Sequence, residues 1–228
     1  MDSINKLYTT KEEGYFDSVR KEIKPLIPEA VGKVLEIGCG SGATLQWIRH
    51  EYGCEWIGGV ELSEESAKIA QEMLDFFVQG NIEQMELPFE PGSLDLILCL
   101  DVLEHLVDPW GVLKRLVRFL KPEGVLIVSM PNICHHSASF PMLFRDRWDY
   151  TPSGILDKTH LRFFTRKTSI ELFEQAGLRV NGVLSVVPIT VGSKVWLFNL
   201  LTLGRLRRFL TTQYLISGTL SLQLKDTN

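Results

Sequence analysis

Apolar and polar residues alternate along the chain in blocks that predict strands and helices in turn. Short apolar runs bounded by turn residues predict strands at 34–37, 56–60, 76–79, 94–100, 125–130 and 178–188. Helical spacing, with capping residues in front and Gly or Pro behind, predicts helices at 44–52, 66–74, 108–120 and 168–176. The run 94–100 (LDLILCL) is almost continuously apolar, which is typical of a buried parallel strand. This alternation predicts an α/β fold with a mostly parallel sheet that is covered on both faces.

The two ends of the chain and one internal stretch depart from this rhythm. An N-terminal helix is predicted by four apolar residues that share one helical face: Tyr15, Phe16, Val19 and Ile23. Pro25 and Pro28 are expected to end this helix. A helix near 193–210 and a last strand at 213–224 are expected at the other end. Residues 131–166 are rich in His, aromatic and charged side chains. No repeat or linker divides the chain, so we expect a single domain over 1–228.

Composition narrows the class of protein. The 228 residues are 45% hydrophobic and carry a net charge of −4, with no dominant basic stripe, which disfavours nucleic acid as a partner. The four cysteines show no metal-ligand spacing and are expected to be reduced thiols. No signal-peptide core and no membrane-spanning apolar run is found, so we expect a soluble, cytoplasmic protein without a transmembrane segment.

The strongest local motif is the glycine loop at 34–42, VLEIGCGSG, between a predicted strand and a predicted helix. Glycines allow a sharp turn and close approach of a ligand, and the exposed N–H groups at the helix start favour an anionic group. The spacing is G-x-G-x-G, and Glu36 comes just before it. A carboxylate there would repel a pyrophosphate but favour a sulfonium or ammonium group. Both details disfavour a nicotinamide oxidoreductase.

A second carboxylate follows at the next strand end. Glu61 lies about twenty residues after the loop, where a carboxylate accepts hydrogen bonds from both hydroxyls of a ribose. An exposed acid at a strand end is the alternative interpretation. Together with Glu36, this residue suits a positively charged nucleoside.

With these residues the chain resembles the class I S-adenosylmethionine-dependent methyltransferases of the methyltransferase domain 11/12 type. The resemblance rests on VLEIGCGSG (34–42), GGVELS (58–63) and the stretch 80–132. It implies S-adenosyl-L-methionine as cofactor and a Rossmann-like, seven-stranded, mostly parallel sheet with an antiparallel last strand. It also implies helices on both faces, an N-terminal helix (1–30) over the cofactor site, and an acceptor-side cap insertion (131–166) after strand five.

The resemblance assigns cofactor contacts to residues around the strand ends. The loop glycines would pack on the methionine moiety, Glu36 would lie near its amino group, and Glu61 would contact the ribose. Asn81 stands where the family often has an acid for the adenine amino group; its amide oxygen still accepts, but without charge assistance. The full set is Glu36, Gly38, Cys39, Gly40, Ser41, Gly42, Glu61, Leu62, Asn81, Ile82, Leu100 and Asp101.

The acceptor is expected beyond the end of strand five, where ligands of such sheets bind. A cap over 131–166 would orient the acceptor and exclude water. The stretches 148–150 and 154–165 resemble a subgroup found with surface-polysaccharide and glycosyltransferase genes, which implies a sugar or glycan acceptor. Trp148 and Tyr150 could stack on a sugar face or form the core of the cap. The expected substrate contacts are Asn132, His135, His136, Trp148, Tyr150 and Arg162.

A neutral sugar hydroxyl is a poor nucleophile, so a positioned base would assist methyl transfer. The candidates are His160, His105 and Asp157. His160 follows Asp157 by one helical turn, so the carboxylate could orient its imidazole; a structural hydrogen bond is the alternative. His105 follows strand four, near the expected methyl group. No tight ligand cluster is visible in the sequence, so no metal is predicted.

Three functions are carried forward from the sequence. The first is methylation of a hydroxyl on a sugar or glycan precursor. The second is N- or O-methylation of a non-sugar metabolite, and the third is a non-catalytic cofactor-binding protein. We expect a monomer or homodimer. Arg205, Arg207 and Arg208 after the apolar stretch 195–203 would allow peripheral membrane contact, although a core-packed helix with a basic edge is the other interpretation.

Overall fold

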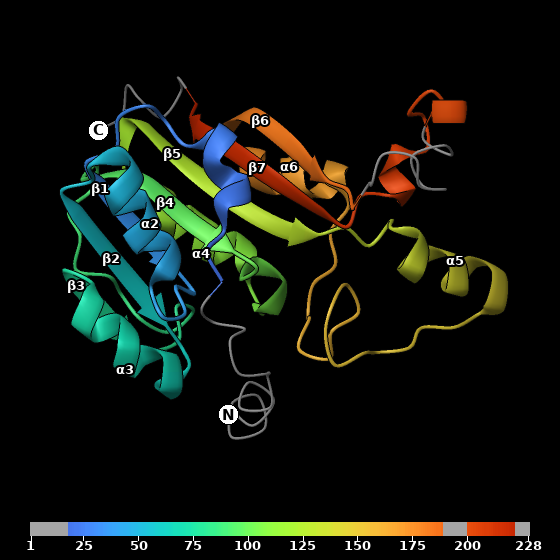
Figure 1. Ribbon diagram of the computed structural model, residues 1–228, viewed down its shortest axis with the longest axis horizontal. Helices are drawn as coiled ribbons and strands as arrows, with labels where there is room; N and C mark the ends of the chain where they lie inside the picture. Colours follow the sequence, from blue (N-terminus) through green and yellow to red (C-terminus); the bar gives the residue numbers. More distant parts are fainter. Residues whose placement is uncertain (1–17, 189–199, 222–228) are drawn as a thin grey trace.

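The computed structural model describes residues 18–188 and 200–221. Its centre is a seven-stranded sheet of order β3-β2-β1-β4-β5-β7-β6, in which β7 runs antiparallel to both neighbours (Figure 1). The strands are β1 (Lys33–Ile37), β2 (Trp56–Glu61), β3 (Phe76–Gln79), β4 (Leu94–Leu100), β5 (Leu120–Pro131), β6 (Leu178–Val186) and β7 (Gln213–Leu220). The predicted Rossmann-like sheet with an antiparallel last strand is therefore confirmed.

Helices cover the sheet on both faces, as expected. The α-helices are α2 (Ala43–Tyr52), α3 (Glu64–Met73), α4 (Pro109–Leu116), α5 (His136–Arg145) and α6 (Arg166–Gln175). Short 3₁₀ helices are η2 (Lys21–Leu26), η3 (Leu103–His105), η4 (Val117–Phe119) and η5 (Arg207–Phe209). In Figure 1, α2 and η2 lie on one face, and α4 and α6 lie on the other.

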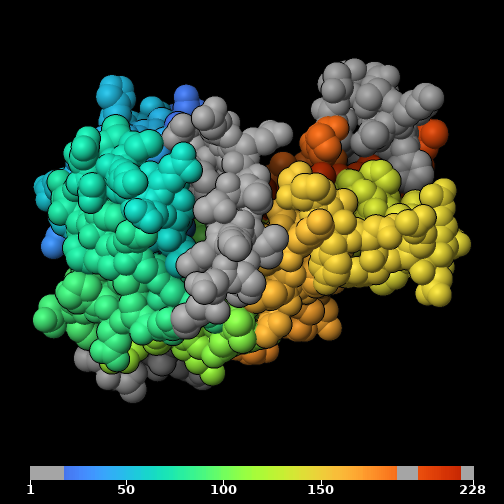
Figure 2. Space-filling model, turned by 90° about the horizontal axis from the view of Figure 1, so that it is seen from below, coloured from blue at the N-terminus to red at the C-terminus, as the bar shows by residue number. Residues whose placement is uncertain are grey.

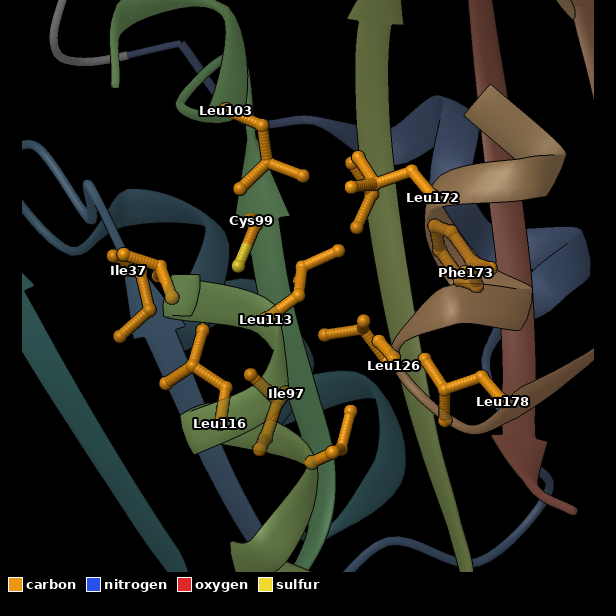
Figure 3. Packing of buried hydrophobic residues seen from close by; sticks show 14 of the residues in the cluster. Ile37, Ile97, Cys99, Leu103, Leu113, Leu116, Leu126, Leu172, Phe173 and Leu178 are labelled. Atoms are coloured by element: carbon orange, nitrogen blue, oxygen red, sulfur yellow. The ribbon is translucent and has the colours of Figure 1, made fainter. Parts of the chain in front are cut away.

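The middle of the sheet is buried on both sides because side chains alternate along each strand. Ile97 of β4 belongs to the same buried cluster as Leu113 of α4 and Phe173 of α6 (Figure 3). Leu98, the next residue, belongs to the cluster on the opposite face, together with Leu45 of α2. The apolar run 94–100 is thus a central strand, as its composition predicted.

Local capping explains where two of the helices begin. The Ser63 hydroxyl accepts a hydrogen bond from the Ser66 N–H at 3.5 Å at the start of α3. Asp108 caps α4 in the same way, accepting from the Gly111 N–H at 3.0 Å, and Pro109 occupies the first helical position. Both starts were visible in the sequence.

Strand β5 begins earlier than predicted. We expected Pro122 and Gly124 to separate a helix from a strand that starts at Val125, but β5 already begins at Leu120. The pairing of β4 with β5 has a register shift between Leu94 and Leu96, and such irregularities accommodate a proline within a strand.

The predicted terminal helices differ from the structure in the described residues. The first described helix is the short 3₁₀ helix η2, which contains Pro25 instead of ending before it; Tyr15 and Phe16 lie outside the described residues. The helix expected at 193–210 does not continue through its described part, because Leu203 and Gly204 adopt left-handed conformations (φ 51° and 72°). Strand β7 ends at Leu220, and the expected residues 222–224 lie outside the described part.

Residues 131–165 leave the sheet at the end of β5 and project from the body of the molecule (Figures 1 and 2). The segment consists of α5 and a long irregular loop, which returns through an isolated bridge between Asn132 and Phe164. Three arginines near this segment are exposed: Arg205, Arg207 and Arg208. Their exposure is compatible with peripheral membrane contact, which stays a prediction. Among the described residues, no helix has the length and apolar character needed to cross a membrane.

Candidate active site

A cavity of about 590 Å³ opens at the carboxyl ends of β1, β2 and β4. Strand order reverses at β1, between β2 and β4, and ligands of open α/β sheets bind at such a switch point. Ten of the twelve predicted cofactor residues line this cavity: Glu36, Gly38, Cys39, Gly40, Glu61, Leu62, Asn81, Ile82, Leu100 and Asp101. Ser41 and Gly42 do not line it; they complete the loop and lead into α2.

The glycine loop needs its glycines for two reasons. Gly38, Gly40 and Gly42 have φ values of 70°, 54° and 85°, in the left-handed region. A Cβ on Gly38 would also lie 2.6 Å from Cγ2 of Val102, which lines the same cavity. The Gly38 and Cys39 N–H groups donate to Val60 O at 2.7 and 3.1 Å, so the loop folds back on β2.

Glu61 holds this loop and the start of α3 together. Its Oε2 accepts from the Gly40 N–H at 2.9 Å, and its Oε1 accepts from the N–H groups of Leu62 and Ser63 at 2.8 and 2.7 Å. The residue is 7% exposed yet lines the cavity. Carboxylate oxygens have further lone pairs, so the same group retains acceptor capacity towards a ligand.

Glu36 is a buried acid beside the same cavity. Its residue is 3% exposed, and its Oε2 has no hydrogen-bond partner among the described residues. Burial raises its pKa to about 8; the positive charge of Arg20 opposes this shift, and the negative charge of Glu61 adds to it. A cationic ligand group beside Glu36 would stabilise the ionised carboxylate.

Arg20 and Gln213 line the cavity and were missed by sequence reasoning. Arg20 forms an ion pair with Asp101, and the Gln213 side-chain amide donates to the same carboxylate. Ser129 Oγ donates to Asp101 Oδ1 at 2.9 Å and accepts from the Asp101 N–H at 2.9 Å. Asp101 itself has φ 57°. These four residues come from distant parts of the chain, and no local motif marks Arg20 or Gln213.

Part of the cavity lining is apolar. His105 lines this part beside Val102, Leu106, Val107 and Leu161. Its Nδ1 lies 3.1 Å from Thr159 O, and its ring centroid lies 4.7 Å from that of His160. The fold therefore brings together two of the predicted catalytic side chains from separate segments.

Asp157 and His160 each have a hydrogen-bond partner close by in the chain. The Asp157 Oδ1 accepts from the Thr159 N–H at 2.8 Å and from Thr159 Oγ1 at 2.7 Å, a local turn that engages the carboxylate. The His160 Nδ1 lies 2.9 Å from Ile155 O. Asp157 lies outside the cavity lining, and its role as a partner of His160 stays a prediction.

The six predicted substrate residues, Asn132, His135, His136, Trp148, Tyr150 and Arg162, are absent from the lining of this cavity.

Two of these six, Asn132 and His135, form hydrogen bonds that stabilise the projecting segment. The buried Asn132 amide donates to Arg208 O and Thr211 O, both at 2.8 Å. His135 caps α5 by accepting from the Ser137 N–H, and burial, with His136 next to it, lowers its pKa to about 4. The Asn132 amide and the His135 Nδ1, which were expected to bind the acceptor, are therefore hydrogen-bonded within the protein.

The other four lie on or near the surface. His136 Nδ1 lies 3.0 Å from Phe209 O, and Arg162 donates to Val107 O. Trp148 packs edge-on against Phe163 with centroids 5.0 Å apart, and Tyr150 is 50% exposed. Trp148 keeps 36% of its surface exposed, so a stacking surface and a cap core both stay predictions for it.

The fold and the glycine-loop site define a class I S-adenosylmethionine-dependent methyltransferase. A family model described as "Methyltransferase domain" matches residues 11–182, most of the chain, and the chain belongs to this family. Its cofactor is therefore S-adenosyl-L-methionine, and it is a small-molecule methyltransferase.

Individual relatives and a solved structure agree with this assignment. A ubiquinone biosynthesis O-methyltransferase from Thiobacillus denitrificans is 25% identical over 182 residues, covering 74% of this chain and 77% of the relative. A chloroplastic tocopherol O-methyltransferase from Arabidopsis thaliana is 30% identical over 143 residues, covering 59% and 38%. The structure of an S-adenosylmethionine-dependent methyltransferase from Archaeoglobus fulgidus shares the fold, with a TM-score of 0.64, 21% identity and coverage of 91% and 97%.

Proposed function

We propose that this enzyme methylates a hydroxyl group on an apolar, ring-bearing, non-sugar metabolite. The observation that carries the proposal is the apolar part of the cavity lining, where His105 stands among Val102, Leu106, Val107 and Leu161, and which we assign as the acceptor end. A saccharide carries a hydroxyl on most carbons, and each one left unpaired against these side chains would cost about 1–3 kcal/mol. A hydrocarbon ring loses nothing there and gains from leaving water.

The names of the relatives support the same choice. Both curated relatives described above are O-methyltransferases, one of ubiquinone biosynthesis and one of tocopherol. The second of the three functions carried forward from the sequence thus has more support than the sugar acceptor. A phenolic hydroxyl, with a pKa near 10, also loses its proton more easily than an alcohol.

The cofactor would lie along the strand ends with its methionine part over the glycine loop. Its ammonium group would neutralise Glu36, whose buried carboxylate lacks a partner at Oε2. Its carboxylate would pair with Arg20, which lies close enough to Glu36 to affect the pKa of that carboxyl. The ammonium and the carboxylate of the methionine part would then each lie beside a protein group of opposite charge, Glu36 and Arg20.

The nucleoside part would occupy the other side of the loop. Glu61 would accept hydrogen bonds from the ribose hydroxyls while it keeps its bonds to the backbone. Asn81 and Ile82 would border the adenine, and Leu100 and Asp101 would lie near the sulfonium. Methyl transfer is an in-line displacement: the acceptor oxygen bonds to the methyl carbon as the carbon–sulfur bond breaks, and the acceptor proton passes to a base.

The domain organisation fits this placement. We treat 1–228 as one methyltransferase domain in which the N-terminal segment reaches the cofactor and the insertion reaches the acceptor. Ser18, Arg20 and Glu22 line the cavity from one side, and Leu161, from the insertion, lines it from the other. The insertion lines the cavity with Leu161, near its C-terminal end, and not with residues of α5.

A methyl-transfer screen tests the proposal. Purified enzyme would be incubated with cofactor carrying a labelled methyl group and three matched panels: phenols, amines of the same ring systems, and nucleotide sugars or glycan fragments. We expect label in the phenols. Label transferred to saccharides alone, or to amines alone, would refute the proposed acceptor class while leaving the methyltransferase assignment intact.

A further inference from the structure

Glu104, His105 and His160 form a compact group of side chains that can ligate a metal ion. One ligand atom from each lies within 4.8 Å of those from the other two. Glu104 is 1% exposed and His160 is 7% exposed, while His105 faces the cavity. From this arrangement we propose a divalent transition-metal site, with zinc as the best match, at the acceptor end of the cavity.

The two imidazoles are oriented as metal-binding histidines usually are. His105 Nδ1 lies 3.1 Å from Thr159 O, and His160 Nδ1 lies 2.9 Å from Ile155 O. A carbonyl oxygen can only accept, so in the neutral form of each ring Nδ1 carries the proton and Nε2 is the nitrogen that can ligate a metal. Hydrogen bonding of one ring nitrogen to a backbone carbonyl is the arrangement that fixes the tautomer of metal-ligating histidines.

The backbone holds the two contributing segments together. The N–H groups of Leu161 and Arg162 donate to Glu104 O at 2.7 and 3.0 Å, which joins the loop after His160 to η3. No metal was predicted because the sequence shows no tight ligand cluster, and His160 indeed lies far from Glu104 and His105 in the chain. The cluster exists only once the insertion folds back onto the end of β4.

The ligand set selects the class of metal. Two imidazoles and one carboxylate suit zinc and its first-row neighbours, whereas magnesium and calcium prefer oxygen ligands. Three protein ligands and an open fourth position are typical of catalytic zinc, in contrast to closed structural sites. Zinc–nitrogen bonds of about 2.0–2.1 Å place neighbouring ligand atoms about 3.4 Å apart, so binding draws these side chains together.

The open position would serve the acceptor. This step rests on the proposed function, because it needs a hydroxyl acceptor beside His105. Bound to the cation, the hydroxyl loses its proton to water or buffer at a lower pH. The oxygen electron pair then forms the bond to the methyl carbon, the carbon–sulfur electrons remain on sulfur, and the products are a methyl ether and the neutral thioether nucleoside.

Metal binding is tested directly with cobalt(II), which reports a nitrogen-and-oxygen site by its visible absorption. The full-length protein, stripped with a chelator, would be titrated with Co²⁺, then with Zn²⁺ as competitor. We expect saturation at about one Co²⁺ per chain, displaced by Zn²⁺, and affinity at least about tenfold weaker in His105→Ala and His160→Gln. His136→Ala is the control, because its Nδ1 also lies beside a backbone carbonyl but it stands outside the cluster.

The outcomes separate this proposal from its alternatives. No saturable Co²⁺ binding, or equal binding in His136→Ala and His160→Gln, would overturn it and make the cluster a structural contact between η3 and the insertion. Circular dichroism of each variant and calorimetry with S-adenosylmethionine check that the fold and the cofactor site persist. Because binding is read without acceptor, failure of the phenol screen leaves the metal result unaffected, and the converse also holds.

Discussion

The carboxylate of Glu61 at the end of β2 accepts a hydrogen bond from the backbone N–H of Gly40, 2.9 Å away in the loop after β1. The same carboxylate accepts from the N–H groups of Leu62 and Ser63. One side chain therefore fixes the shape of the glycine loop and the start of α3. Any ligand contact that Glu61 makes depends on a group already held rigidly by the backbone, which is how a binding site is preorganised.

Glu61→Gln should weaken both the loop and cofactor binding. The amide has one accepting oxygen, so its NH₂ group must face an N–H donor at Gly40 or at Leu62 and Ser63. Loss of a charge-assisted hydrogen bond is worth about 1.5–3 kcal/mol, so we expect an affinity loss of about ten- to a hundredfold by calorimetry and a lower Tm. Glu64→Gln, at an exposed α3 position, is the control. Wild-type affinity in Glu61→Gln would remove Glu61 from the binding site.

Gly38→Ala should abolish cofactor binding. The new methyl group would lie 2.6 Å from Val102 Cγ2 at a backbone position with φ 70°, so the loop or the Val102 side chain must move into the cavity space. Gly53→Ala is a matched control, since its φ is 67° but nothing lies within 4 Å of the added Cβ. Both variants should lose about 1–2 kcal/mol of stability in chemical denaturation, while calorimetry should show lost binding in Gly38→Ala alone. Equal affinity in the two variants would contradict the role given to the loop.

The cofactor half of the site was predictable because its information is local. The glycine loop with Glu36, and the strand end with Glu61, are short contiguous motifs whose geometry follows from a strand-turn-helix unit. Strand and helix positions were predictable for the same reason, since Leu94–Leu100 and the capping residue Ser63 carry their signals in neighbouring residues. Arg20 could not be recognised in this way, because only the folded sheet brings Arg20 and Gln213 next to Asp101.

The acceptor half was not predictable for the opposite reason. His, Asn and Trp side chains in the insertion were interpreted as ligands, but Asn132 donates to the carbonyl of Arg208 and His135 accepts from the N–H of Ser137. Asp157 is engaged by Thr159 in a local turn, a competition that residue types alone do not reveal. His105 and His160 were singled out separately, and only the folded chain shows that their rings meet.

Cofactor binding should release a proton near neutral pH. Burial raises the pKa of Glu36 to about 8, so the cofactor-free protein is largely protonated there at pH 7, and an ammonium group would drive the proton off. Because the pKa of the folded state exceeds that of the unfolded chain, stability without cofactor should fall as pH rises from about 4.5 towards 8. Calorimetry at pH 7 in buffers of different ionisation enthalpy should show close to one proton released. Glu36→Gln should show none, and release in that variant would point to another group.

Arg20→Gln should weaken binding of the cofactor through its carboxylate. The guanidinium lines the cavity and pairs with Asp101, so it can turn to an incoming carboxylate without leaving the site. We expect about a ten- to hundredfold loss of affinity for S-adenosylmethionine, but no loss for its decarboxylated analogue. Arg49→Gln on α2, which breaks an ion pair with Asp75, is the control. An equal loss for both ligands would mean that Arg20 acts by holding Asp101 in place.

Leu161→Asn should change acceptor use and leave cofactor binding intact. Leu161 is 39% exposed and lines the acceptor end of the cavity, so an amide there introduces a polar group beside the acceptor ring. The KM for a phenolic acceptor should rise about fivefold to thirtyfold, matching about 1–2 kcal/mol of lost apolar contact, with unchanged affinity for S-adenosylmethionine. Ile69→Asn on α3, at a residue 47% exposed and outside the cavity lining, should behave as wild type. A lower KM for saccharides in Leu161→Asn would show that polarity at this position selects the acceptor. An unchanged KM for both classes would place the acceptor elsewhere and remove the observation on which the proposed substrate class rests.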